Sequence, residues 1–202
     1  GATSSVVRMI GPLFAYKSEL STTQTGVFLA LFVVGGATAQ MPFGFLTERY
    51  SSRQMLATLS LLALISSLAF RFFGDVTIVG IPSLFILVFI FGASTMPLYS
   101  LCATHANNLT TVQDMTALSA SLIFFFAGGA IISPILAAEL IDQFGPNAMF
   151  SYFAGLHGLL LLYTLYRARI RPNVPTTKVY MYIPRTTLFI AKTIRTLRSR
   201  KH

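Results

Sequence analysis

The sequence predicts an all-α integral membrane protein with six transmembrane helices, and three observations lead to this fold class. Of the 202 residues, 54% are hydrophobic and only 10% are charged, whereas an ordinary soluble domain carries about 25% charged residues. The mean hydropathy is +0.69. The apolar residues form long continuous runs, unlike the short alternating strands of a membrane barrel. So few polar residues cannot cover a surface in water, so we expect lipid to be the solvent of this chain.

The apolar runs have the length that a membrane span requires. A helix that crosses a hydrocarbon core of about 30 Å needs about 20 mostly apolar residues. Five segments approach or exceed that length: roughly Gly26–Leu46, Met55–Phe73, Ile78–Ala103, Thr116–Leu140 and Ala148–Tyr166. A sixth and shorter segment, Ala2–Tyr16, carries Arg8 and is expected to form a span as well.

Basic residues are concentrated at the end of the chain. Ten of the 15 Lys and Arg residues lie from Arg167 onward, and no Asp or Glu lies there. The sequence therefore divides into a six-span bundle, residues 1–166, and a basic tail, residues 167–202. Lys and Arg next to membrane spans favour the cytoplasm, which predicts a cytoplasmic tail. The tail either adsorbs to anionic membrane lipid or is solvated, and we do not expect it to bind nucleic acid.

The short connections between the runs make the spans alternate in direction. Counting back from a cytoplasmic tail puts residues 48–54 and 105–114 on the cytoplasmic side, together with the start of the chain. The connection that carries Lys17 and Glu19 then faces outward, as does the one that carries Arg71 and Asp75. Each of these two basic residues is expected to lie near the acidic residue that follows it.

A compact group of charges interrupts the apolar sequence between the second and third spans. The stretch GFLTERYSSR contains Gly44, Glu48, Arg49 and Arg53. It resembles the cytoplasmic-loop signature of the major facilitator superfamily, which reads Gly, three variable residues, Asp, Arg, one variable residue, Gly and two basic residues. Here Glu48 replaces the Asp and Ser51 replaces the second Gly.

Other segments are similar to the carboxy-terminal half of the same superfamily. SLFILVFIFGASTMPLYSLCATHANN resembles the tenth helix of a bacterial subgroup of these transporters, and GGAIISPILAAELIDQFGP resembles the eleventh helix. The resemblance implies six helices that form one half of the superfamily fold, in the bacterial inner membrane. The first residues, GATSSVV, include no initiator Met, so we expect the chain to begin inside a longer protein.

The resemblance also implies a function. We expect a secondary active transporter that moves a small-molecule substrate by alternating access, with the missing amino-terminal six-helix half, or a second copy of the chain, as partner. The alternative is a six-span membrane interaction or assembly protein, either a homodimeric half-carrier or a half that no longer transports.

Two interpretations of the charged signature stay open. In the superfamily such residues latch the cytoplasmic side, and Glu48 would pair with an Arg or with a helix N-terminus. The alternative is that Glu48, Arg49 and Arg53 only anchor a hairpin and set the topology. In either case Gly44 is expected to let a neighbouring helix approach closely.

Polar residues inside the spans are the candidates for a substrate or coupling pathway. Arg8 precedes Gly11-Pro12 and either holds an anionic group or snorkels toward the surface. Gln40 either faces the pathway or bonds to a neighbouring helix. Tyr99 and Ser100 are expected to line a cavity near Pro97. His105 is expected near the cytoplasmic mouth, where it titrates or simply caps the helix.

Other features predict packing rather than chemistry. Gly35 and Gly36 have small-residue spacing that suits helix contact, and His157 is expected to be packed and hydrogen-bonded. Glu139 is expected at the outer interface. No cofactor or metal site is predicted, because Cys102 is alone and the spans hold no cluster of ligands. With no paired catalytic carboxylates and no phosphate-binding loop, the sequence does not predict an enzyme.

Overall fold

The structure is a computed structural model that describes residues 1–73, 77–78 and 80–170, apart from the side chains of Glu48, Ile78, Asn108 and Val112. Asp75 and residues 171–202 of the predicted tail therefore lie outside the described residues. Within the described part, all long elements are α-helices, which agrees with the predicted all-α class.

Five helices in the described part of the chain are long and apolar enough to cross a membrane. They are α3 (Thr22–Arg49), α4 (Ser52–Phe73), α5 (Ser83–Asn108), α6 (Met115–Phe144) and α7 (Ala148–Ile170). A 3₁₀ turn, η1 (Val112–Asp114), leads into α6. Five of the six predicted spans are therefore confirmed, and α7 continues beyond the predicted Tyr166 to include Arg167 and Arg169.

The sixth predicted span, Ala2–Tyr16, is not confirmed as one helix. It consists of two short helices, α1 (Ala2–Met9) and α2 (Gly11–Lys17), with Ile10 between them. Pro12 lies in the first turn of α2. Proline has no N–H to donate to the carbonyl four residues earlier, and the first helical turn is the place where that bond is not required. The Gly11-Pro12 pair therefore starts a new helix.

The third predicted span begins later than expected. Instead of starting at Ile78, α5 starts at Ser83, after a small antiparallel hairpin of β1 (Thr77–Ile78) and β2 (Ile81–Pro82). Gly80 has φ +76°, which glycine adopts without steric cost. The Ser83 hydroxyl donates to the carbonyl of Phe73, so the start of α5 is held against the end of α4.

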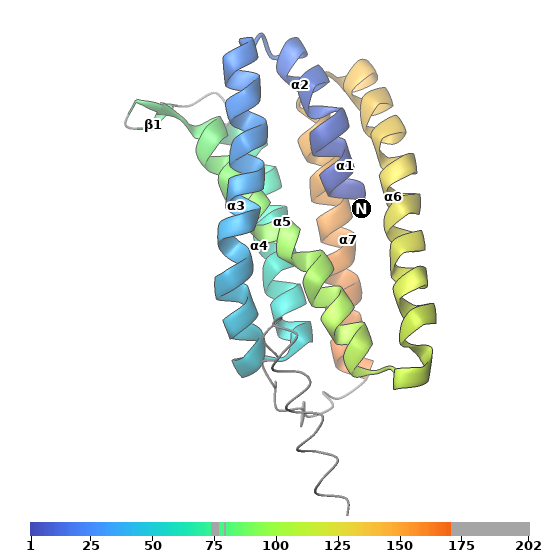
Figure 1. The fold of residues 1–202 in the computed structure, drawn as a ribbon. Helices are drawn as coiled ribbons and strands as arrows, with labels where there is room; N and C mark the ends of the chain where they lie inside the picture. The colour runs from blue at the N-terminus through green and yellow to red at the C-terminus, as the bar shows by residue number, and fades with distance from the viewer. Residues whose placement is uncertain (74–76, 79, 171–202) are drawn as a thin grey trace, which may run out of the picture.

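Helices α3, α4, α5 and α7 pack into one group, and α1 lies beside α6 (Figure 1). Fully buried phenylalanines fill the group, among them Phe28, Phe32, Phe91, Phe150 and Phe153. The backbones of α3 and α5 touch at Gly35, where an added Cβ would lie below 3.0 Å from the carbonyl oxygen of Phe89. The close packing predicted for Gly35 and Gly36 is thus confirmed.

Several hydroxyl groups buried in the bundle are satisfied within their own helices, although the Ser60 hydroxyl has no hydrogen-bond partner among the described residues. Ser67 donates to the carbonyl of Ala63 at 2.7 Å, and Thr95 donates to the carbonyl of Phe91 at 2.8 Å. An unpaired polar group is costly where no water is present, so this local bonding lets hydroxyls face an apolar interior.

Helix α1 pairs with α6 along its length, although the two are far apart in the sequence. An alanine Cβ at Gly129 would meet the backbone nitrogen of Ala2 at 3.2 Å. Beyond the end of α1, Lys17 Nζ, at the last residue of α2, lies 2.5 Å from Asp142 Oδ1 of α6. The ion-pair partner of Lys17 is thus on α6, and the nearness of Lys17 to Glu19 stays a prediction.

Loss of the Lys17–Asp142 ion pair is expected to change stability only slightly. Asp142 is 66% exposed, and exposed ion pairs contribute about 0–1 kcal/mol. Lys17→Gln should therefore lower the free energy of unfolding by less than about 1 kcal/mol, measured by denaturant titration in detergent. Asp142→Asn is the matched variant, and the double variant should be no less stable than either single one. A loss of several kcal/mol would contradict this surface role.

Candidate functional site

The charged signature spans the end of α3 and the start of α4. Gly44, Glu48 and Arg49 lie in the last turns of α3, and Arg53 lies in the first turn of α4. Arg49 is exposed and Arg53 is half-buried, whereas the side chain of Glu48 lies outside the described residues. The end of the bundle that holds Arg49 and Arg53 is called the signature end below.

Ser51, at the position where the superfamily signature has a glycine, caps α4. Its Oγ accepts from the backbone N–H of Gln54 at 3.3 Å, and its own N–H donates to Gln54 Oε1 at 3.2 Å. This reciprocal arrangement is a capping box, which satisfies two of the free donors at a helix start. The motif Ser51-x-x-Gln54 is the sequence signal for this capping box, and it is not among the predictions above.

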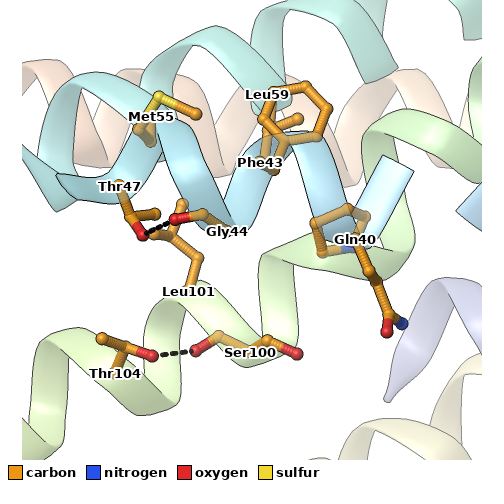
Figure 2. A pocket seen from close by; sticks show the side chains of 10 residues that line it. Gln40, Phe43, Gly44, Thr47, Met55, Leu59, Ser100, Leu101 and Thr104 are labelled. Atoms are coloured by element: carbon orange, nitrogen blue, oxygen red, sulfur yellow. Dashed lines mark hydrogen bonds between the residues drawn. The ribbon is translucent and has the colours of Figure 1, made fainter. Parts of the chain in front are cut away.

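A cavity of about 180 Å³ lies next to the signature, between α3, α4 and α5 (Figure 2). Its lining is contributed by Gln40, Phe43, Gly44, Thr47, Met55, Leu59, Pro97, Ser100, Leu101 and Thr104. The predicted pathway residues Gln40 and Ser100 therefore meet Gly44 of the signature at one cavity. This juxtaposition is absent from the linear sequence, because these residues come from two different spans.

The close helix approach predicted at Gly44 is wrong. Among the described residues, no atom outside the adjoining helix backbone lies within 4 Å of the place that its Cβ would occupy. The missing side chain instead leaves open space at the cavity. Gly35, which lies earlier in the same helix, is where the backbone of α3 touches that of α5.

The polar groups of this cavity differ in whether they are available to a ligand. Thr47 Oγ1 donates to the carbonyl of Gly44 at 2.6 Å, and Thr104 Oγ1 donates to the carbonyl of Ser100 at 2.9 Å (Figure 2). Gln40 and Ser100 are exposed. The Gln40 amide and the Ser100 hydroxyl are therefore the side-chain groups best placed to meet a solute.

Tyr99 faces a different space from Ser100, its neighbour in the sequence. Successive residues of a helix point about 100° apart, and Tyr99 lines a second cavity, between α1, α5, α6 and α7. Its ring meets that of Phe126 edge to face, with centroids 5.3 Å apart. Tyr99 and Ser100 therefore each line a cavity, but not the same one.

Arg8 and His105 lie outside both of these cavities. Arg8 is in the last turn of α1 and its side chain is exposed. His105 is half-buried in the last turn of α5, where the charges of Arg53 and Arg167 act on it. Three basic side chains from α4, α5 and α7 therefore gather at the signature end.

The two other ionisable residues that the sequence singled out inside the spans, His157 and Glu139, each have a hydrogen-bond partner. His157 is 4% exposed, and its Nε2 lies 3.3 Å from Thr3 Oγ1, which confirms the prediction of a packed, hydrogen-bonded histidine. Glu139 is exposed and accepts from Gln143 Nε2 at 2.6 Å. Within the described ranges, no group of three or more His, Cys, Asp and Glu residues could hold a metal ion.

Comparison with known proteins gives a consistent family. The sequence model of the Major Facilitator Superfamily matches residues 1–201. An "Uncharacterized MFS-type transporter" of Enterobacter sp. (strain 638) is 26% identical over 162 residues, which is 80% of this chain and 40% of that protein. The "Uncharacterized MFS-type transporter YcaD" of Salmonella paratyphi B is 24% identical, with the same two shares.

A third relative, from Yersinia pestis (strain Pestoides F), carries the same description. It is 23% identical over 154 residues, which cover 76% of this chain and 38% of the relative. The chain therefore spans about two fifths of the length of these curated relatives. No solved structure matches it significantly.

Proposed function

Because the chain belongs to the Major Facilitator Superfamily, we propose that it forms the carboxy-terminal six-helix half of a secondary carrier in the bacterial inner membrane. Five membrane-crossing helices support this, with α1 and α2 together as the sixth segment. The share of the relatives that the chain covers also fits one half of a carrier. The observation that carries the proposal is the cavity at which Gln40 and Ser100 meet the signature.

The carrier moves a small molecule by alternating access. Two half-bundles rock about a substrate held between them, so each conformation opens the site to one side of the membrane. In this scheme Gln40 and Ser100 contact the solute on its way past the signature end. Arg8, exposed on α1, meets an anionic group of the solute or an acidic residue of the other half.

The signature end faces the cytoplasm, together with the end of α7 that leads into the tail. The expectation that the start of the chain lies there as well is not met, because Gly1 packs against Phe126 halfway along α6 (Figure 1). The basic residues Arg49, Arg53, Arg167 and Arg169 support this orientation through the positive-inside rule. Residues 167–202 continue as a basic cytoplasmic tail that contacts anionic lipid.

The partner of this half is an amino-terminal six-helix half. A second copy of the chain is the alternative. The broad apolar surface of α6 favours association with either of these two partners. Phe124 and Phe125 on this helix are both more than 70% exposed. Association without transport remains the competing function.

Transport is tested with the natural full-length protein in membrane vesicles. We expect the protein to transport at least one small solute without ATP, driven by an ion gradient. Arg49→Ala should abolish this transport while the protein still reaches the membrane. Screening a labelled mixture of metabolites by mass spectrometry identifies the solute. If vesicles that contain the protein accumulate the same solutes as vesicles that lack it, the result would favour the assembly function.

Neutralising the signature is expected to open the cytoplasmic side. In a Cys102→Ser background, Ser100→Cys reports access to the cavity. Glu48→Gln should make a membrane-impermeant thiol reagent label this cysteine several-fold faster from the cytoplasmic side, because a latch contact is lost. Glu139→Gln neutralises an acid at the opposite end and should leave the rate unchanged. Equal rates in all three proteins would leave the signature with only an anchoring role.

A further inference from the structure

A groove of about 470 Å³ lies at the end of the bundle opposite the signature end. Its lining consists of Arg71 from α4, Leu140 and Phe144 from α6, and Ala148, Ser151 and Tyr152 from α7. Helices α4 and α6 both pack against α7, so the groove lies where these three helices meet. It is separate from the cavity that Gln40 and Ser100 line.

The position of Arg71 along α4 brings the groove to the level of lipid headgroups. Helix α4 has 22 residues, which corresponds to a length of about 33 Å and is close to the hydrocarbon thickness of about 30 Å. Arg71 lies in the last turn of α4, and Ser151 lies in the first turn of α7. The polar groups of the groove are therefore placed where the phosphates of a bilayer begin.

Arg71 gives the groove a positive charge. Among the described residues of the lining, no side chain is that of Asp or Glu. The exposed acids Glu139 and Asp142 of α6 have partners outside the lining. A guanidinium is always charged, and its N–H groups match the oxygens of a phosphate. The hydroxyls of Ser151 and Tyr152 can donate to the same group, so the polar part of the groove suits a phosphate.

The rest of the groove is apolar and open to the surroundings of the helices. Phe144 is 71% exposed, and Leu140 and Ala148 add apolar surface to the same groove. A free phosphate would leave this surface uncovered, whereas a hydrocarbon chain attached to the phosphate would lie against it. The lining therefore matches a ligand that has both a phosphate and an acyl chain.

We propose that this groove binds one phospholipid, whose phosphodiester contacts the Arg71 guanidinium and whose acyl chain lies along Leu140 and Phe144. Basic pockets between membrane helices are a known way of holding lipid headgroups. With the signature end in the cytoplasm, as proposed above, the lipid belongs to the outer leaflet. Lipid binding is measured without transport, so failure of either proposal leaves the other untouched.

Photo-crosslinking locates the bound lipid. The natural full-length protein is purified in dodecyl maltoside, which contains no phosphate, and is irradiated with a phosphatidylglycerol that carries a diazirine in its acyl chain. Mass spectrometry of the peptides measures labelling at residues 140–144. It also measures labelling at Leu159, which is 68% exposed in the middle of α7 and reports contact with bulk lipid. The competitors are unlabelled phosphatidylglycerol and a diacylglycerol with the same chains, which lacks the phosphate.

We expect phosphatidylglycerol to suppress labelling of residues 140–144 at a concentration about fivefold lower than diacylglycerol, as one exposed charge contact predicts. Arg71→Gln should abolish this difference. Lys17→Gln is the matched control, because it removes a cation at the same end of the bundle that is paired with Asp142, and it should behave like the natural protein. Labelling of Leu159 should respond equally to both competitors in all three proteins.

Four results would overturn the proposal. Equal competition by the two lipids in the natural protein would mean that the headgroup contributes nothing. An unchanged preference in Arg71→Gln would place the phosphate elsewhere. Competition by soluble glycerophosphoglycerol at the concentration at which phosphatidylglycerol competes would mean that the groove takes a free phosphate ester. Labelling of Leu159 without labelling of residues 140–144 would mean that protein covers the groove. The comparison of the two lipids needs no variant, so it stands even if Arg71→Gln fails to fold.

Discussion

Gly35→Ala is expected to separate α3 from α5 and to destabilise the bundle by about 3 kcal/mol, the upper part of the range for overpacking. The added Cβ would lie below 3.0 Å from the carbonyl oxygen of Phe89. That oxygen belongs to the backbone of α5, so no side-chain rotation relieves the clash. Gly92 makes the reciprocal contact with the carbonyl oxygen of Phe32, so both backbones would have to move.

Dodecyl sulfate titration of the purified protein measures this loss. Gly26→Ala is the matched control on the same helix, because no atom of the described chain outside the adjoining helix backbone lies within 4 Å of its added Cβ. It is expected to be neutral or slightly stabilising, since alanine favours the helix over glycine. Equal stabilities of Gly35→Ala and Gly26→Ala would show that the two helices do not approach as closely as described.

Phe91→Ala is expected to have the second largest effect, a loss of about 2 kcal/mol or more from removed packing contacts. Phe91 is 1% exposed, and its ring lies 4.9 Å from that of Phe153 and 6.0 Å from that of Phe32, between centroids. Lipid is as apolar as the interior, so the loss comes from packing rather than from exposure to water. Three helices would lose contacts at one position.

Thermal unfolding of the protein in detergent checks this expectation. Phe124→Ala removes the same side chain from α6, where it is 74% exposed, and should change the unfolding temperature little. A loss at Phe124 equal to that at Phe91 would mean that α6 is covered by protein at that position. It would thereby locate the surface at which a partner binds.

Hydropathy was sufficient to predict the five long helices but not the way in which they pack. In water, the buried face of a helix is its apolar face, whereas every face of α3 is apolar. The sequence could therefore not distinguish Gly35, which touches α5, from Gly44, which faces open space. The same ambiguity hid the pairing of α1 with α6.

Two boundary errors have local causes that the sequence did contain. Gly11-Pro12 is a recognised break, and reading Ala2–Tyr16 as one span ignored the missing N–H of Pro12. The run from Ile78 was read as helix because it is apolar throughout, although Gly80 and Pro82 are turn and breaker residues. At both places, glycine and proline predict the helix boundary better than hydropathy does.

The candidate site was predictable in kind but not in arrangement. Gln40, Tyr99 and Ser100 were identified because polar groups within spans are costly, and all three line cavities. Their division between two cavities follows from the rotation of α5, which the sequence does not specify. Thr47 and Thr104 were missed because a hydroxyl bonded to its own helix leaves no pattern in the sequence.

The pairing of α1 with α6 constrains how the protein is made. Lys17, at the end of the α2 helix that directly follows α1, and Asp142 of α6 are 125 residues apart. A ribosome that adds about 5–20 residues per second takes roughly 6–25 s to cover that distance. During this interval α1 has left the ribosome without its partner, while α3, α4 and α5 already find each other in the bilayer. Of the helices described here, α1 is therefore translated first but reaches its final packing among the last. Until α6 has been made, α1 has no packing partner. During that time we expect it to be accessible to an insertase or a quality-control protease.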